Sequence, residues 1–298
     1  MTEIWSGAPV AATILQEVAA ALEAGRERGW PPPTLLSIHQ GGTTPFQPYL
    51  RQQERMAGRT GLGFRSHPLP SGATAGDLQD LVERANRDPS VDGVILEHPL
   101  PPALRFGDAV DRLRPEKDVD GVGAGNLGRL LAGRPVQVPA VARAALRTAR
   151  HYFGPLAGRR VAVVGRSPTV GIPIALLAAS RGPEGDATVT LAHSRTGDLA
   201  ASLAGMEVIF SAAGRPGLLD RRVVPRGAAV VDVGTSAVED PRGPGEPRRL
   251  VGDADPADLD GWAGALTPVP GGVGPVTVAM LAHNTIRAWQ ALRAPEVR

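Results

Sequence analysis

In the first half of the chain, segments with a helical spacing of hydrophobic residues alternate with short, continuous apolar runs. A 3.6-residue spacing predicts helices over residues 10–28, 49–59 and 77–86, and the first has Ile14, Val18 and Leu22 on one face. Short apolar runs predict strands over residues 34–39, 62–66 and 91–96, with Pro31–Pro33 and Pro99–Pro102 as boundaries. Alternating strands and helices indicate a parallel sheet with helices on its faces.

The second half repeats this alternation with the spacing of a doubly wound sheet. A helix is predicted over residues 141–152, strands over 160–164, 188–191, 208–211 and 229–233, and a closing helix over 276–292. Because 298 residues exceed the usual size of one core, we expect two α/β domains. The predicted N-terminal domain is 1–139, completed by a returning helix within 276–298, and a Rossmann-type domain covers 140–275.

Composition excludes several classes of function. Lys+Arg 32 against Asp+Glu 30 gives a net charge of +2, and no basic block is interleaved with aromatic residues, so we expect no nucleic-acid partner. The sequence has no apolar run of 18 residues and an acidic residue near its N-terminus, which predicts a cytoplasmic protein without a membrane segment. Cysteine is absent and the six histidines are scattered, so no metal site is predicted.

The segment from Gly165 to Gly171 has the chemistry of a phosphate-binding turn. It follows a predicted strand as Gly165-Arg166-Ser167 and opens a helix at Val170-Gly171. Backbone N–H groups and a helix N-terminus in this layout receive a phosphate. The spacing differs from GxGxxG, and a glycine-rich turn with no ligand is the alternative interpretation.

The next predicted strand favours NADP over NAD. It ends in His193-Ser194-Arg195-Thr196, with no acid before Asp198. An acid at this place in NAD enzymes holds the ribose 2′-hydroxyl, whereas a basic residue accommodates a 2′-phosphate. Arg195 and Ser194, with Arg166 from the first turn, therefore point to NADP; the alternative is that both arginines are ordinary surface charges.

Further motifs occur in order along almost the whole chain. They are Asn86-Arg87-Asp88, Val91-Asp92-Gly93-Val94-Ile95-Leu96, Pro99-Leu100-Pro101, Lys117-Asp118-Val119-Asp120-Gly121, Asn126-Leu127-Gly128-Arg129-Leu130, Val164-Gly165-Arg166-Ser167, His193-Ser194-Arg195-Thr196, Gly214-Arg215-Pro216, Asp232-Val233-Gly234, Gly252-Asp253 and Thr267–Pro275. With these motifs the chain resembles the bifunctional methylenetetrahydrofolate dehydrogenase/cyclohydrolase family.

The resemblance implies a catalytic domain, an NADP domain, folate in a cleft between them, and a homodimer formed through the NADP domains. It implies that Tyr49 stacks on the substrate and that Asp120 binds the amino-pyrimidine edge of the pterin. Alternatively, Tyr49 is a core residue and Asp120 caps a loop. Other implied contacts are Pro99, Leu100, Pro270, Gly271, Gly272 and Pro275 for the substrate, and Gly165, Arg166, Ser167, Gly171, His193, Ser194, Arg195 and Thr235 for the cofactor.

Two positions depart from the family pattern at the catalytic site. The family has a lysine four residues after the tyrosine, on the same helix face, and this chain has Gln53 after Tyr49. The family strand ends in Val-Gln-Leu-Pro-Leu-Pro, where the glutamine bonds that lysine, and this chain has Glu97 in the corresponding Leu96-Glu97-His98-Pro99. A cation and an amide have become an amide and an acid.

This exchange separates the two family activities. Hydride transfer from the methylene carbon to the nicotinamide is driven by the substrate's nitrogen lone pairs and needs alignment rather than a base. Hydrolysis of the methenyl cation needs a group that titrates near neutrality, which a lysine with a lowered pKa provides and Gln53 does not.

Glu97 has three open interpretations. Its carboxylate, at about 4 Å from the methenyl cation, stabilises that cation by roughly 4 kcal/mol at an effective dielectric near 20. With a pKa raised by burial it is itself the acid/base. In the third interpretation it only forms a structural pair with Gln53.

Three further differences concern the shape of the site. Phe46 stands where the family has a small serine, Pro139-Ala140-Val141-Ala142 replaces Pro-Cys-Thr-Pro, and His98 precedes Pro99. Because adjacent strand residues point to opposite faces, we expect His98 to pack away from Glu97.

The sequence predicts an NADP-dependent 5,10-methylenetetrahydrofolate dehydrogenase with weak or lost cyclohydrolase activity. Tyr49, Gln53, Glu97 and Asp120 form its predicted catalytic site. One alternative is a specialised biosynthetic enzyme of the same fold that uses another one-carbon or imine-like substrate. The other is a ligand-binding relic without catalysis.

Overall fold

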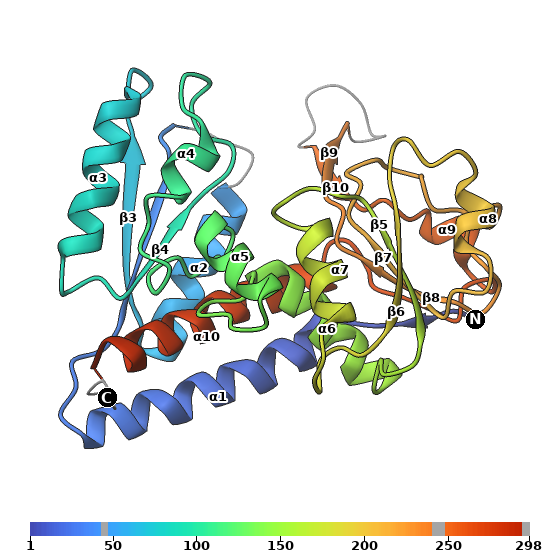
Figure 1. Cartoon of the computed structure of the whole chain (residues 1–298), viewed down its shortest axis with the longest axis horizontal. Helices are drawn as coiled ribbons and strands as arrows, with labels where there is room; N and C mark the ends of the chain where they lie inside the picture. Colours follow the sequence, from blue (N-terminus) through green and yellow to red (C-terminus); the bar gives the residue numbers. More distant parts are fainter. Residues whose placement is uncertain (43–46, 240–247, 294–298) are drawn as a thin grey trace. The chain divides into compact units, whose positions relative to one another are not determined.

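The protein forms two compact α/β units. The computed structural model describes residues 1–42, 47–239 and 248–293. One unit, called the three-stranded unit below, comprises Ala12–Ala140 and the chain from Val278 onward; the other, the six-stranded unit, comprises Met1–Ala11 and Val141–Thr277. Figure 1 labels the helices and strands of both units where there is room.

The three-stranded unit has a parallel sheet in the order β3-β2-β4. A cluster of apolar side chains under α3 covers one face with Leu36, Ile38 and Leu96 of the sheet. A second cluster joins α1, α2 and α10 around Val18, Met56 and Trp289. The elements are α1 (Gly7–Glu27), β2 (Thr34–Gln40), α2 (Gln47–Thr60), β3 (Gly63–Leu69), α3 (Ala75–Arg87), β4 (Gly93–Leu96), α4 (Phe106–Val110), α5 (Ala124–Leu131) and α10 (Val273–Arg293).

The six-stranded unit has a sheet in the order β1-β11-β8-β7-β5-β6, in which neighbouring strands are parallel. Its central strands β7 and β8 are buried throughout, and β5 is buried except at Arg160, as their apolar sequences predict. The elements are β1 (Glu3–Ile4), α6 (Ala140–Phe153), β5 (Arg160–Val164), α7 (Gly171–Ala179), β6 (Thr188–Ala192), α8 (Leu199–Leu203), β7 (Val208–Ser211), β8 (Ala229–Asp232), β9 (Ser236–Val238), β10 (Arg249–Val251), α9 (Pro256–Leu259) and β11 (Ala265–Leu266). The predicted α/β class and Rossmann-type sheet are therefore confirmed.

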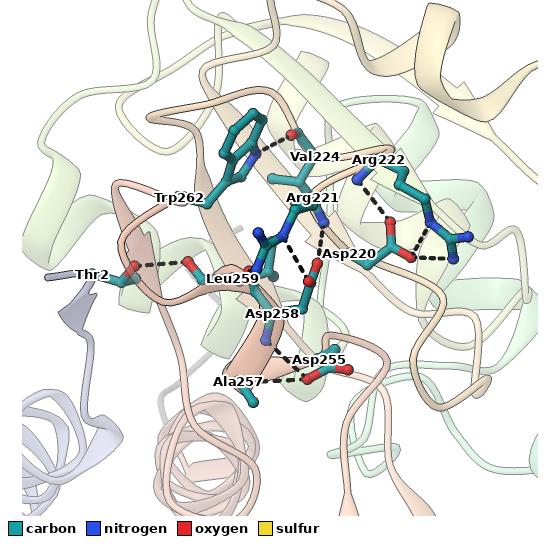
Figure 2. Close-up of polar contacts among 10 residues, drawn as sticks. All are labelled: Thr2, Asp220, Arg221, Arg222, Val224, Asp255, Ala257, Asp258, Leu259 and Trp262. Atoms are coloured by element: carbon teal, nitrogen blue, oxygen red, sulfur yellow. Dashed lines mark hydrogen bonds and ion pairs between the residues drawn. The ribbon is translucent and has the colours of Figure 1, made fainter.

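The first residues of the chain differ from the predicted domain boundaries. We expected residues 1–139 to share one domain, but Met1–Ala11 belong to the six-stranded unit. The reason is that β1 pairs with β11, and the Thr2 hydroxyl donates to the carbonyl oxygens of Leu259 and Ala263 at 2.9 Å each. Figure 2 shows the contact of Thr2 with Leu259 beside the Arg221–Asp258 ion pair.

None of the described helices has the length and apolar character that crossing a membrane requires.

Candidate active site and cofactor site

Glu97 and Gln53 are in direct contact inside the three-stranded unit. Glu97 follows the last residue of β4, and its Oε1 accepts hydrogen bonds from Gln53 Nε2 at 2.6 Å and from Ser37 Oγ at 3.2 Å. Gln53 has no exposed surface and Glu97 is 6% exposed. The other atom of the amide, Gln53 Oε1, is buried and accepts no hydrogen bond from the described residues. The two positions that depart from the family pattern thus form one buried pair.

Tyr49 and Asp120 share the electrostatic environment of Glu97. Burial raises the pKa of Tyr49 well above its usual value, and the negative charges of Glu97 and Asp120 raise it further. Burial also raises the pKa of Asp120 to about 7, with smaller contributions from the charges of Asp118 and Glu97. Tyr49 is partly buried against the cluster of α1, α2 and α10. The structure therefore brings the four predicted catalytic residues into one neighbourhood.

Hydrogen bonds hold the loop that carries Asp120. Asp118 accepts from the backbone N–H groups of Gly121 and Gly123, and from Asn126 Nδ2, each at 2.9 Å. On the other side, Asn284 of α10 donates to the Val119 carbonyl at 2.8 Å. Asp118 is thus a structural carboxylate that holds the loop on which Asp120 lies.

The chain has a single lysine, Lys117, and backbone carbonyls at the end of α3 hold its amine. Its Nζ donates to the backbone carbonyls of Ala85 at 2.9 Å and Asp88 at 2.8 Å, beside the end of α3. The residue is 2% exposed, and burial lowers its pKa. No other position in the sequence supplies a lysine amine for proton transfer.

The other predicted substrate contacts are divided between the two units. Pro99 is exposed, whereas Leu100 is a core residue of the cluster under α3. Pro270, Gly271, Gly272 and Pro275 lie in the six-stranded unit, where the Gly272 N–H donates to the Pro268 carbonyl at 2.7 Å.

The structure describes two of the three further differences from the family pattern. His98 is exposed and its ring lies 5.4 Å from the ring of Phe106, so it packs away from Glu97 as strand alternation predicts. Ala140 and Ala142 are buried at the start of α6, and the Ala140 N–H donates to the Asp120 carbonyl at 3.0 Å. Phe46 lies outside the described residues.

The predicted phosphate-binding turn joins β5 to α7. Gly165 has φ +124°, and a Cβ there would lie 2.2 Å from the Ala212 carbonyl oxygen. A Cβ on Gly171 would lie 2.1 Å from the carbonyl oxygen of Gly165. Only glycine therefore allows this close approach of backbone, which sets the shape of the turn at the N-terminus of α7. Ser167 Oγ supports the turn by accepting from the N–H groups of Val170 and Gly171.

The turn lies where strand order reverses, because β5 has β6 on one side and β7 on the other. In open α/β sheets, ligands bind at the carboxyl ends of strands at this switch point. The following loops are braced by Asp253, whose carboxylate accepts from Ser211 Oγ, and from the N–H groups of Ala213 and Arg215. Thr235 is exposed just beyond β8.

The end of β6 presents basic rather than acidic groups. Ser194 and Arg195 are exposed in a turn closed by the His193 N–H donating to Thr196 Oγ1 at 2.8 Å. Asp198, the first acid beyond this turn, caps α8 by accepting from the Ala201 N–H at 2.9 Å. Its carboxylate is thereby engaged, which leaves the site suited to a phosphate.

Comparisons with known proteins agree with this arrangement. Residues 5–120 match the model of the tetrahydrofolate dehydrogenase/cyclohydrolase catalytic domain, and residues 139–293 match that of the family's NAD(P)-binding domain. The chain belongs to the tetrahydrofolate dehydrogenase/cyclohydrolase family. It is thus a member of a family of oxidoreductases, as the order of its motifs predicted.

Relatives match over almost their entire length. The bifunctional protein FolD of Chloroflexus aurantiacus is 40% identical over 285 residues, which cover 96% of each chain. The 5,10-methylenetetrahydrofolate dehydrogenase of the silkworm Bombyx mori is 35% identical, with a TM-score of 0.89 and coverage of 98% of this chain and 99% of that chain. The Trypanosoma brucei dehydrogenase-cyclohydrolase, solved with NADP and an inhibitor, has the same identity, TM-score and coverage.

Sequence reasoning missed Ser37 and His39 of β2. Both are buried, at 0% and 6% exposure, and Ser37 contacts Glu97 directly. The available signal was the pair of polar residues within the apolar run Thr34–Gln40.

In the described residues, no cluster of His, Asp or Glu has the arrangement of a metal site.

Proposed function

We propose that the protein is an NADP-dependent 5,10-methylenetetrahydrofolate dehydrogenase whose cyclohydrolase activity is weak or lost. The dehydrogenase rests on family membership and on relatives of 35–40% identity. The loss of hydrolysis rests on one observation: Gln53 Nε2 donates to Glu97 at 2.6 Å at the site where the family pattern has a lysine. A buried amide has no proton to exchange near neutral pH.

NADP supplies a hydride acceptor when bound. The glycine turn from Gly165 to Gly171 at the N-terminus of α7 suits a phosphate, and exposed Arg166 and Arg195 suit the additional 2′-phosphate. The end of β6 supports NADP over NAD, because Arg195 is exposed there and the first acid that follows, Asp198, caps α8 through its Oδ1.

Substrate binding falls to the buried cluster of the three-stranded unit. Asp120, when ionised, accepts the N–H groups of the amino-pyrimidine edge, and Tyr49 stacks on the ring system. Gln53 Oε1 is an unsatisfied buried acceptor, and leaving it unpaired costs about 1–3 kcal/mol. A donor on the bound substrate, or a water molecule beside it, recovers this energy.

Glu97 gives the site a preference for cationic states. At about 4 Å from a developing cation, its carboxylate contributes roughly 4 kcal/mol at an effective dielectric near 20. The dehydrogenase step creates such a cation, whereas hydrolysis consumes it. Glu97 therefore favours formation and retention of the methenyl product.

We further propose a homodimer formed through the six-stranded unit. The edge strand β6 exposes Leu191, and the apolar helix α7 leaves Ile172 and Leu176 partly exposed. An edge strand with apolar exposure is suited to pairing with a second copy. Light scattering coupled to size-exclusion chromatography tests this, with a mass of one chain as the contrary result.

Methenyl hydrolysis is the decisive assay for the proposed function. Purified protein is added to 5,10-methenyltetrahydrofolate, and the loss of its absorbance is compared with the spontaneous rate in the same buffer. We expect no acceleration beyond about tenfold. Acceleration comparable to that of a bifunctional relative measured in parallel would overturn the loss of cyclohydrolase activity.

A second substrate class is favoured by the two neighbouring carboxylates, Glu97 and Asp120. Such a pair suits an imine-like substrate with a positive charge and N–H donors. Binding of NADP without binding of reduced folate in calorimetry would select this alternative, and tight binding of both ligands would dismiss it.

A further inference from the structure

The three-stranded sheet places His39 beside Glu97. Ile38 of β2 pairs with Leu96 of β4, and the Glu97 N–H donates to the Ile38 carbonyl at 2.8 Å. Extending this register by one residue makes His39 and Glu97 neighbours on adjacent strands. Aligned residues of parallel strands point to the same face, so both side chains share one face with Ser37.

Ser37, His39 and Glu97 are the polar residues of β2 and the end of β4 that lie on this face. Leu36, Ile38 and Leu96 on the opposite face belong to the apolar cluster under α3. Ser37 and His39 are as buried as these apolar residues. Burying polar groups is unfavourable unless they are satisfied, so the set has a role that apolar residues could not fill.

The hydrogen bonds of His39 place the proton of its neutral ring on Nδ1. Its Nδ1 lies 2.9 Å from the Gln40 carbonyl, which only accepts, so Nδ1 carries a proton in both charge states. Its Nε2 lies 2.8 Å from Ser66 Oγ, a hydroxyl on β3 that donates to the neutral ring and accepts from the cation. The imidazolium form of His39 therefore has both N–H groups satisfied.

His39 is the source of positive charge beside Glu97 in the described part of the chain. Gln53 of α2 and Ser37 of β2 donate neutral hydrogen bonds. The other titratable groups of this neighbourhood are Tyr49 of α2 and Asp120, and neither of them carries a positive charge. Burial raises the pKa of Glu97, whereas the hydrogen bonds from Gln53 and Ser37 and, to a smaller extent, the charge of His39 lower it.

We propose that His39 is the counterion of Glu97, a positioning residue that acts through charge to keep the carboxylate ionised toward the substrate. The imidazolium compensates the buried carboxylate from the neighbouring strand, without contact with the substrate. Its catalytic consequence rests on the proposed function, because an ionised Glu97 matters for a reaction that develops positive charge. The charge pair itself is a property of the free protein.

Infrared spectroscopy of the free protein tests the pair without any ligand. The carbonyl stretch of protonated Glu97, assigned by its loss in Glu97→Gln, is followed against pH. In His39→Gln, which keeps a polar side chain but removes the charge, we expect the titration of Glu97 to move upward by about 1 pH unit or more. His67→Gln is the matched control, because His67 of β3 aligns with Ile38 and therefore lies on the opposite face of the sheet. The titration of Glu97 in this variant is expected to stay within about 0.3 of wild type, a margin well below the effect of a lost neighbouring charge.

Enzyme kinetics provide the second reading. The acidic limb of the dehydrogenase pH profile is expected to move upward by the same amount in His39→Gln, while the rate on the alkaline plateau changes less than about threefold, because Glu97 is ionised there in both proteins. Near-ultraviolet circular dichroism checks the fold, and His39→Asn replaces the glutamine variant if that protein does not fold.

The outcomes separate the two proposals. An unchanged infrared titration in a folded His39 variant overturns the counterion, whatever the substrate is. A shifted titration without any oxidation of methylenetetrahydrofolate supports the counterion and rejects the proposed function. An equal shift in His67→Gln also overturns the counterion, since loss of a histidine on the opposite face would then have the same effect on Glu97.

Discussion

Restoring the family's lysine tests how the Gln53–Glu97 pair controls hydrolysis. Gln53→Lys alone puts an ammonium where Nε2 now lies 2.6 Å from Glu97 Oε1. At about 4 Å and an effective dielectric near 20, the attraction is about 4 kcal/mol, which raises the pKa of the new lysine by about 3. The lysine then stays protonated at neutral pH and is a poor base.

Replacing both residues removes that attraction. In the double variant Gln53→Lys with Glu97→Gln, the lysine sits in a buried site beside a neutral amide, and desolvation lowers its pKa toward neutrality. A positioned general base contributes about 10²–10⁴-fold. We therefore expect methenyl hydrolysis to increase about 10²–10⁴-fold in the double variant and much less in Gln53→Lys.

The assay is the decay of methenyl absorbance at pH 7 with the wild type and three variants. Glu97→Gln alone is the control, because it changes the acid without adding a base. The reasoning is refuted if the double variant folds, binds NADP and reduced folate, and still hydrolyses at the wild-type rate. It is also refuted if Gln53→Lys alone equals the double variant.

Three further results are expected. Burial raises the pKa of Asp120 to about 7, and we propose that its ionised form binds the pterin. The KM for folate should therefore rise as pH falls below 7, and Asp120→Asn should give a higher, pH-independent KM in initial-rate assays. Arg195→Ser should raise the KM for NADP about tenfold and leave that for NAD unchanged, as measured with each cofactor in turn. Gly25→Ala should lower the free energy of unfolding by about 1–3 kcal/mol in urea titrations, because its Cβ would lie 1.8 Å from the Trp289 ring; an unchanged midpoint would contradict this packing.

Periodicity predicted the long elements well. The predicted strand 160–164 coincides with β5, and the predicted helix 141–152 lies within α6 (Ala140–Phe153). These segments combine a clear hydrophobic pattern with glycine or proline at their ends, so local sequence determines them. The strand pair β1–β11 was not predicted, because two residues carry no period and their pairing joins distant parts of the chain.

Only the residues of the candidate site that stand in known motifs could be predicted from the sequence. Gln53 and Glu97 stood out because each departs from a known pattern, and their 2.6 Å contact follows from the fold. His39 matched no motif, and its place beside Glu97 depends on the register of two strands separated by more than 50 residues. Tertiary pairing of this kind has no local signature.

A single time course tests the central claim most directly. Protein, 5,10-methylenetetrahydrofolate and NADP are mixed, and NADPH and the methenyl product are followed together by absorbance. The account predicts that both form in equal amounts and that the methenyl product then decays at its spontaneous rate. Formation of NADPH without accumulation of the methenyl product would contradict it, because hydrolysis would then proceed without the lysine.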